Sequence, residues 1–224
     1  MDRLKVIAHI HTDFPEKFGV PRQSGIVKSL IGRIVFEPEF RSSDVLKGIE
    51  EFDYLWLLWE FEGVASDKFV ATVRPPRLGG NETRGVFATR SPFRPNPIGL
   101  SSVKLERVEF SDREGPVIYV SGVDMRDNTP IFDIKPYLSY ADAHPEASDG
   151  FAGDHLEEAL TVDFPDELLA MIPADKHEAL TEVLSQDPRP HYQNDPERVY
   201  GVSFAGRNIK FVVRDNVLTV TAVE

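Results

Sequence analysis

Cysteine is absent from this chain of 224 residues, which excludes disulfides, zinc–thiolate sites and a cysteine nucleophile. Long hydrophobic runs are also absent: no stretch of about 18 uncharged apolar residues occurs, so we expect no transmembrane helix. The opening residues, MDRLKVIAHIHTDF, lack the basic start, apolar stretch and small-residue cleavage site of a signal peptide. These absences are typical of a soluble cytoplasmic protein.

Several catalytic signatures are missing as well. There is no G-x-G-x-x-G loop, Walker loop, G-x-S-x-G or H-E-x-x-H, and strands and helices do not alternate as in a Rossmann fold. His9 and His11 would share one strand face, but a metal site needs more ligands than this pair supplies. We therefore expect no bound metal.

Basic residues are scarcer than acidic ones, and their distribution is uneven. The net charge of −12 argues against a nucleic-acid partner for the chain taken as a whole. Residues 1–110 hold 16 Lys or Arg and 15 Asp or Glu, whereas residues 111–224 hold 9 and 22. Residues 139–182 hold 12 acids and one base, and such a belt is ordinarily a solvated surface. Residues 74–94 are the opposite feature, a basic island with five arginines and one acid.

Short β-rich runs dominate the first two thirds of the chain. Turn residues separate these runs, which predict strands at residues 6–10, 32–36, 54–61, 85–89, 100–108 and 117–122. The strand at 54–61 (YLWLLWEF) is nearly all apolar, so we expect it to be buried on both faces. One short helix is expected before it, with Ser43 as its cap. Many short strands with Gly and Pro between them indicate a mainly β fold, either a barrel or a sandwich.

The chain divides into a main domain, residues 1–140, an acidic linker, residues 141–155, and a small C-terminal domain, residues 156–224. The last part predicts an α+β unit, with a helix at residues 174–185 and strands at residues 200–204, 209–213 and 218–223. About 65 residues bury little core by themselves, so we expect this unit to pack on the main domain.

The densest motif is RPPRLGGNETRGVFATRSPFRPNPIG at residues 74–99, with five arginines and five prolines. Proline fixes φ and removes hydrogen-bond donors, so this stretch predicts a rigid, irregular loop. Guanidinium groups on a rigid loop suit phosphates, which arginine binds in a bidentate manner. The alternative is a structural loop whose arginines pair with nearby acids. The repeated arginine–proline pairs favour a binding loop.

Two turns carry further polar groups. Residues 20–25 (VPRQSG) can present backbone groups and an amide side chain to an adenine edge or an amino acid, although an ordinary turn could have the same sequence. Residues 187–192 (DPRPHY) form a proline-stiffened turn that either packs against the molecule or binds a partner.

The segment NTPIFDIKPYL at residues 128–138 has an alternating pattern. If it is extended, Asp133, Lys135 and Tyr137 share one face, because side chains alternate along a strand. Asp133 and Tyr137 could then act as proton acceptors or hydrogen-bond partners. The alternative is a surface ion pair between Asp133 and Lys135.

Five stretches, in order along the chain, resemble one family. They are KFGVPRQSG, TVRPPRLGGN, GVFATRSPFRPNPIGLS, DNTPIFDIKPYL and QDPRPHY. All five look like the TrmO family of tRNA methyltransferases, and the last resembles its longer, bacterial-type members. The resemblance implies a single β-barrel methyltransferase domain that works as a homodimer, S-adenosylmethionine as cofactor, and no metal. The implied substrate is the anticodon loop of a tRNA with N6-threonylcarbamoyladenosine just 3′ of the anticodon, methylated at the N6 nitrogen.

The motif matches also imply a set of site residues. Cofactor contacts are expected from Gln23, Ser24, Gly25, Phe61, Glu62, Arg90, Leu100, Ile131, Phe132, Asp133 and Ile134. Contacts to tRNA are expected from Arg22, Arg74, Arg77, Arg94, Asn96, Arg189 and Tyr192, of which the last two could instead reach the partner subunit. Asp133 is the first candidate for a general base and Tyr137 the second.

Two positions need separate comment. Glu62 departs from the family pattern, in which a polar residue such as histidine is expected, although a carboxylate would favour a cationic sulfonium or amino group. Phe93 could stack on a splayed RNA base or pack in the core. Two other functions are compatible with a basic binding loop on a β protein: a non-catalytic nucleotide- or RNA-binding protein, and a small-molecule methyltransferase.

Overall fold

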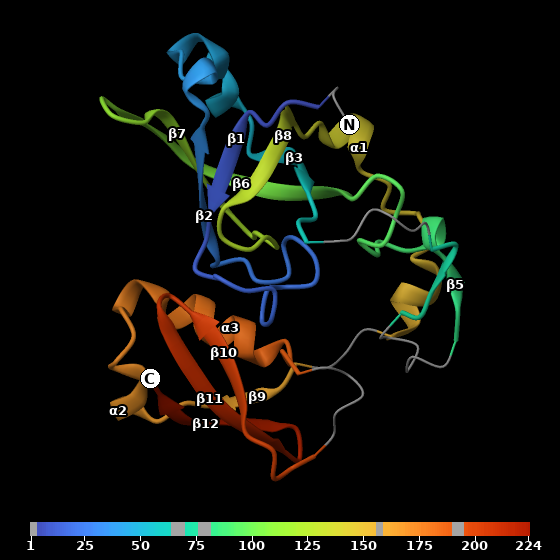
Figure 1. The fold of residues 1–224 in the computed structure, drawn as a ribbon, viewed down its shortest axis with the longest axis vertical. Coiled ribbons are helices and arrows are strands. Elements are labelled where there is room, and N and C mark those ends of the chain that lie inside the picture. The colour runs from blue at the N-terminus through green and yellow to red at the C-terminus, as the bar shows by residue number, and fades with distance from the viewer. Residues whose placement is uncertain (1–3, 64–69, 76–81, 156–158, 190–194) are drawn as a thin grey trace.

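The main body of the molecule is a closed, antiparallel β-barrel (Figure 1). The computed structural model describes residues 4–63, 70–75, 82–155, 159–189 and 195–224. Around the barrel the strand order is β1-β2-β7-β6-β3-β8. The strands are β1 (Ala8–His11), β2 (Ile31–Phe36), β3 (Tyr54–Glu60), β6 (Ile98–Ser111), β7 (Gly115–Ser121) and β8 (Thr129–Pro136). The predicted mainly β fold is confirmed, and closure of the sheet decides for a barrel over a sandwich.

Alternating side chains fill the barrel. Along β3, Leu55 and Leu57 are fully buried and Trp59 is nearly so, while Trp56 and Leu58 are only half-buried. The prediction that this strand is buried on both faces is therefore wrong. A strand in a single barrel has only one face toward the core, and the apolar residues of its outer face form part of the barrel wall.

Two predicted elements differ from the structure. Between β2 and β3 the chain forms only 3-10 turns: η1 (Pro38–Phe40), η2 (Ser43–Leu46) and η3 (Ile49–Glu51). The cap of η2 is Ser42 rather than Ser43, and its hydroxyl accepts the Asp44 N–H at 3.3 Å. The predicted strand at 85–89 is a two-residue strand, β5 (Arg84–Gly85), followed by the turn η5 (Val86–Ala88). The Thr89 hydroxyl donates to the Val86 carbonyl at 2.9 Å, and this local bond closes a turn where a strand was expected.

The C-terminal part is a four-stranded sheet with a covering helix. Its strands are β9 (Thr161–Asp163), β10 (Tyr200–Phe204), β11 (Arg207–Arg214) and β12 (Val217–Val223), in the order β10-β11-β12-β9. Its helices are α2 (Asp166–Leu169), η7 (Ala174–Lys176) and α3 (His177–Ser185). Leu180 and Leu184 of α3 are fully buried with Phe211 and Leu218 of the sheet, as the predicted α+β pattern requires.

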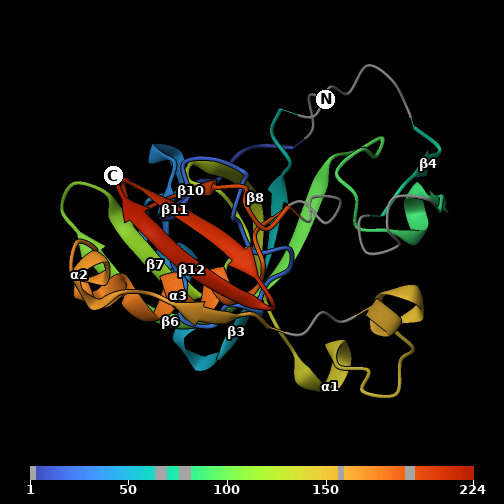
Figure 2. The same ribbon diagram turned by 90° about the horizontal axis from the view of Figure 1, so that it is seen from below.

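The acidic connecting segment and the basic island lie to one side of the barrel. The former contains α1 (Ser139–Asp142) and η6 (Gly150–His155). The latter follows directly on β4 (Thr72–Val73) and contains β5, with which β4 pairs (Figure 2). No helix in the described ranges is long and apolar enough to span a membrane.

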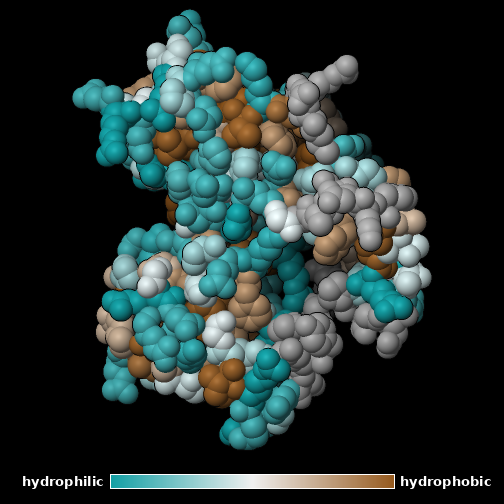
Figure 3. Space-filling view, viewed as in Figure 1, coloured by the Kyte–Doolittle hydropathy of each residue, from teal (hydrophilic) through white to brown (hydrophobic). Residues whose placement is uncertain are grey.

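The long connection between β1 and β2, residues 12–30, lies between the barrel and the C-terminal unit (Figure 1). Phe14 of this connection meets Phe204 edge-on at 5.2 Å between ring centroids, and both rings are fully buried. The Lys176 ammonium lies 2.7 Å from the Asp13 carboxylate across the same boundary. These contacts confirm the predicted packing of the two units. On the face seen in Figure 3, apolar residues form separate patches among hydrophilic ones.

Candidate functional site

The turn at residues 22–25 sits directly on the connection between β7 and β8, residues 122–128. The Gly25 N–H donates to the Gly122 carbonyl at 2.8 Å. Gly122 has φ +76°, and a Cβ there would lie 3.2 Å from the Gly25 Cα. The close approach therefore depends on Gly122, whereas a Cβ added to Gly25 would meet nothing within 4 Å.

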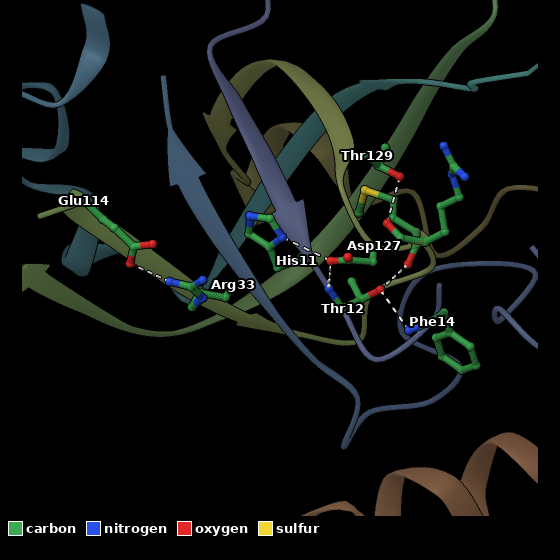
Figure 4. A network of polar contacts seen from close by, with 9 residues as sticks. His11, Thr12, Phe14, Arg33, Glu114, Asp127 and Thr129 are labelled. Atoms are coloured by element: carbon green, nitrogen blue, oxygen red, sulfur yellow. Dashed lines mark hydrogen bonds and ion pairs between the residues drawn. The ribbon is translucent and has the colours of Figure 1, made fainter. Parts of the chain in front are cut away.

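A polar network holds this connection against the end of β1 (Figure 4). The Asp127 carboxylate accepts the Thr12 N–H at 3.1 Å and lies 3.1 Å from His11 Nδ1. The Thr12 hydroxyl donates to the Met125 carbonyl at 3.1 Å, and the Thr129 hydroxyl to the Arg126 carbonyl at 2.9 Å. His11 thus helps to hold the β7–β8 connection in place. The 22–25 turn packs on this connection.

Asp124, which no sequence motif singled out, lies against the turn. Its carboxylate accepts the Ser101 hydroxyl at 2.6 Å and the backbone N–H of Ser24. Burial raises the pKa of Asp124 to about 6, although these hydrogen bonds and the nearby Arg90 charge act in the opposite direction. An acid between the apolar residues Val123 and Met125, just after β7, was the available signal, but only the fold places it beside Ser24.

Gln23 and Arg90, both predicted to bind the cofactor, are in contact. The Arg90 guanidinium donates to the Gln23 side-chain oxygen, and the Gln23 amide nitrogen donates to the Arg22 carbonyl at 2.6 Å. Because Arg90 belongs to the basic loop, this contact joins that loop to the 22–25 turn. The structure therefore brings Gln23, Ser24 and Arg90 together.

Phe61 and Glu62 follow the end of β3, close to the same place. The Phe61 ring lies 4.3 Å from that of Trp59, and its N–H donates to the Pro97 carbonyl at 2.8 Å. The Glu62 carboxylate pairs with Arg126 of the β7–β8 connection. The residue that departs from the family pattern thus has a local cationic partner, and a cationic ligand would compete with Arg126 for it.

The remaining predicted cofactor residues lie along the barrel wall. Leu100 of β6 and Asp133 of β8 are the register partners of Leu58 on its two sides. Leu100 is 56% exposed, whereas Ile131 is fully buried in the barrel, so only its backbone could meet a ligand. Phe132 has no register partner in β3, because the β3–β8 ladder shifts between the pairs Leu58–Asp133 and Trp59–Ile131.

The two candidate bases are apart. The Asp133 carboxylate lies 2.7 Å from the Lys135 ammonium, so the predicted alternative, an ion pair, is present. Tyr137 instead packs against Trp56 and Tyr54, at 5.5 and 6.2 Å between ring centroids. Asp133 and Tyr137 are four positions apart in extended chain, which spans about 13 Å. They cannot act on the same atom without movement of the chain.

The arginines of the basic loop have different surroundings. Arg84 pairs with Glu82 at 2.8 Å, as the structural alternative expected. Arg94 donates to the carbonyls of Thr89 and Ser91 at 3.1 and 3.3 Å, so it braces the loop. Arg74 and Asn96 are exposed. The described arginines are therefore only partly neutralised by acids, which favours a binding loop.

Exposed rings accompany these arginines. Phe93 is 56% exposed and Phe87 is 73% exposed, so the core alternative for Phe93 is wrong. The turn at 187–189 lies near Arg22, whose guanidinium donates to the Asp187 carbonyl at 3.4 Å, while Arg189 forks onto the Asp187 carboxylate at 2.8 and 2.7 Å. Arg77 and Tyr192 lie outside the described residues.

Comparison with known proteins identifies the family of the chain. The family model described as the tRNA-methyltransferase O N-terminal domain matches residues 9–143, and that of the TrmO C-terminal domain matches residues 157–224. The tRNA (adenine(37)-N6)-methyltransferase of Escherichia coli K12 is 39% identical over 226 residues, covering 97% of this chain and 96% of the relative. A Pseudomonas aeruginosa protein named as a candidate S-adenosylmethionine-dependent methyltransferase is 40% identical over 206 residues, which cover 88% of this chain and 86% of the relative.

A solved structure extends the likeness to three dimensions. The crystal structure of a TrmO protein superposes with a TM-score of 0.80 at 31% identity, and the match covers 100% of this chain and 99% of the other. The two family models together cover both the barrel and the C-terminal unit. The chain therefore belongs to the TrmO family.

Proposed function

We propose that this protein is an S-adenosylmethionine-dependent tRNA methyltransferase that methylates the N6 nitrogen of adenine 37, and that this adenine carries an N6-threonylcarbamoyl group. The observation that carries the proposal is the meeting of Gln23, Ser24 and Arg90 at one end of the barrel, beside a loop rich in arginine. The relative in Escherichia coli, matched over nearly its whole length, bears the name of this activity.

The residues at this end of the barrel fit the cofactor chemically. The turn offers backbone groups of Ser24 and Gly25, and Glu62 offers a carboxylate for a cationic group. The half-buried Phe61 ring, packed on the buried Trp59, offers an aromatic surface. S-adenosylmethionine supplies a methyl group that is already activated by a cationic sulfur. The protein therefore mainly needs to orient the two reactants, which is worth roughly 7–11 kcal/mol of the barrier.

The basic loop is proposed to hold the anticodon loop of the tRNA. Arg74 and Arg94 would contact phosphates, and the exposed Phe93 or Phe87 ring would stack on a splayed base, as is usual for single-stranded RNA. Phosphate recognition is local, so a basic island can bind RNA although the whole chain is acidic.

We extend the proposal to a cytoplasmic homodimer in which the exposed Leu100 on the barrel wall is covered.

Asp133 is proposed to take the proton from the N6 nitrogen, because the carbamoyl group withdraws its lone pair. To do so, its carboxylate must exchange the Lys135 ammonium for the substrate. A general base adds about 10²–10⁴-fold to a rate, so Asp133→Asn should slow single-turnover methylation by at least about 10²-fold. An undiminished rate would exclude this role, and Tyr137→Phe, measured in parallel, tests the second candidate.

Nucleoside mass spectrometry tests the function as a whole. The protein and S-adenosylmethionine are incubated with tRNA that carries threonylcarbamoyladenosine, with the same tRNA lacking that modification, and with the free nucleoside. A gain of one methylene mass on the first substrate alone supports the proposal. Cofactor binding without transfer would indicate a non-catalytic RNA-binding protein, and methylation of the free nucleoside a small-molecule methyltransferase.

A further inference from the structure

A chain of hydrogen bonds runs beneath the candidate cofactor site and joins segments far apart in the sequence. The Trp59 indole N–H donates to the Ser101 hydroxyl oxygen at 2.9 Å, and that hydroxyl donates to the Asp124 carboxylate at 2.6 Å. The backbone N–H of Ser24 donates to the same carboxylate. The chain therefore begins at the aromatic end of β3 and ends in the 22–25 turn.

The direction of this chain is set by chemistry. An indole N–H can only donate, so the Ser101 oxygen accepts from Trp59 and its single proton is directed to Asp124. The Ser24 N–H also can only donate. Asp124 must therefore accept from both sides, and a charged carboxylate accepts such bonds most strongly.

Tight packing makes Trp59 and the Ser24 turn, the two ends of this hydrogen-bond chain, sensitive to Asp124 between them. Ser101 is fully buried and Trp59 is 7% exposed. A Cβ on Gly99 would lie 2.2 Å from the Trp59 ring, so the indole is tightly packed on that side. The Phe61 ring also packs on the indole, at 4.3 Å between ring centroids. Loss of the Asp124 charge would loosen the Ser24 turn and the Trp59–Phe61 pair together.

We propose that Asp124 is a positioning residue, whose carboxylate holds the 22–25 turn and the Trp59–Phe61 pair in the mutual arrangement that binds S-adenosylmethionine. It acts through Ser24 and Ser101 and need not touch the cofactor. This inference rests on the proposed function, because it takes the turn and the aromatic pair to be the cofactor site.

The charged surroundings of Asp124 allow a distinctive pH readout. Arg90 is the charged side chain that acts on it, and it belongs to the basic loop. The neighbouring charges of the β7–β8 connection are engaged elsewhere, Arg126 with Glu62 and Asp127 with His11. As the pH falls through the pKa of about 6, Asp124 gains a proton and accepts hydrogen bonds less strongly.

Steady-state kinetics and calorimetric titration with S-adenosylmethionine test the inference on the full chain. Asp124→Asn should raise the KM and Kd for S-adenosylmethionine about 10–100-fold, the usual effect of losing a charged hydrogen-bond partner. The kcat at saturating cofactor and the KM for tRNA should change less than about twofold, which is no more than a typical surface substitution causes. Wild-type Kd should rise as pH falls below 6, while the Kd of Asp124→Asn should stay flat.

Two further variants keep the test decisive. Ser101→Ala breaks the link to Trp59 but keeps the carboxylate, and it should also weaken cofactor binding even if Asp124→Asn fails to fold. Asp112→Asn, in the exposed β6–β7 turn, is the matched control and should behave as wild type.

The possible failures are distinguishable. If the wild-type protein does not bind S-adenosylmethionine, the proposed function itself fails. If it does bind, and folded Asp124→Asn has wild-type affinity and pH profile, only the positioning role is overturned. A loss confined to kcat would also overturn it, because the carboxylate would then act on the chemical step.

Discussion

The Asp124 carboxylate lies where a charge is costly, and this separates it from the other acids of the site. Burial raises its pKa to about 6, whereas hydrogen bonds from the Leu138 N–H and the Trp56 indole lower the pKa of Asp142. Asp133 is exposed enough to keep Lys135 as a salt-bridge partner. A buried acid with a raised pKa next to a binding turn is more often functional than an exposed paired one.

Asp124 should make the stability of the protein depend on pH. Its native pKa lies near 6, above the ordinary value of 3.8, so the native protein keeps a proton that the unfolded chain has lost between about pH 4 and 6. The unfolding free energy should therefore fall as pH rises through this window, by roughly 3 kcal/mol in total. Urea denaturation of wild type and Asp124→Asn at several pH values checks this. Parallel curves for the two proteins would contradict it.

Arg74 is exposed on the basic loop, whereas Arg94 braces the loop through carbonyl contacts. Arg74→Ala should therefore weaken tRNA binding and lower the slope of log Kd against log salt by about 0.7–0.9, the loss of one phosphate contact, without change in cofactor affinity. Salt-dependent binding of labelled tRNA measures this. Arg113→Ala, exposed in the turn after β6, is the control, and an equal effect of both variants would argue against a localised RNA surface.

At the scale of elements, the site depends on how closely two connections meet. The β1–β2 connection presents the 22–25 turn, and the β7–β8 connection supports it through Gly122. The hydrogen bonds of Asp127 and Thr12 lock the second connection to β1 (Figure 4). The strands of the barrel thus act as a rigid frame, and the polar chemistry is carried by its connections.

Gly122→Ala tests this contact. Its positive φ costs an alanine about 1–2 kcal/mol, and the new Cβ would also press on Gly25 at 3.2 Å. Gly206→Ala is a matched control, because Gly206 has φ +74° but nothing within 4 Å of an added Cβ. Gly122→Ala should lose more stability than Gly206→Ala in thermal unfolding, and it alone should weaken binding of S-adenosylmethionine. Equal effects would mean that the close approach is unimportant.

At the scale of the whole molecule, the C-terminal unit braces the connection that carries the cofactor turn. Residues 12–30 are held on one side by the barrel and on the other by Phe204, Lys176 and Glu182. The Glu182 carboxylate accepts the Ser29 hydroxyl at 2.7 Å and its N–H at 3.2 Å. The C-terminal unit therefore supports the connection that carries the candidate site, and its Asp187 carbonyl also accepts a hydrogen bond from Arg22 of the 22–25 turn.

Glu182→Ala should cost about 1–3 kcal/mol of stability, because two hydrogen bonds to a charged group at Ser29 are lost. Amide hydrogen exchange should become faster in residues 26–30 while the barrel strands keep their protection. Glu178→Ala, exposed on the same helix, is the control and should change neither quantity. Unchanged exchange in residues 26–30 would show that the C-terminal unit does not brace this connection.

The sequence by itself determined the mainly β class, most strand positions, the α+β nature of the C-terminal unit and the family. These features depend on local periodicity, turn residues and long motifs, which can be read along the chain. It did not determine the 3-10 turn after β5 or the outer face of β3, where a local hydroxyl bond and barrel closure overrode the apolar pattern.

Only the tertiary structure decided which of the predicted site residues are neighbours. It joined Gln23 to Arg90, gave Glu62 a partner in Arg126 and separated Asp133 from Tyr137. It also revealed Asp124 beneath Ser24. The physical reason is that hydrogen bonds and burial depend on distances in space, and barrel closure brings together connections that lie far apart along the chain.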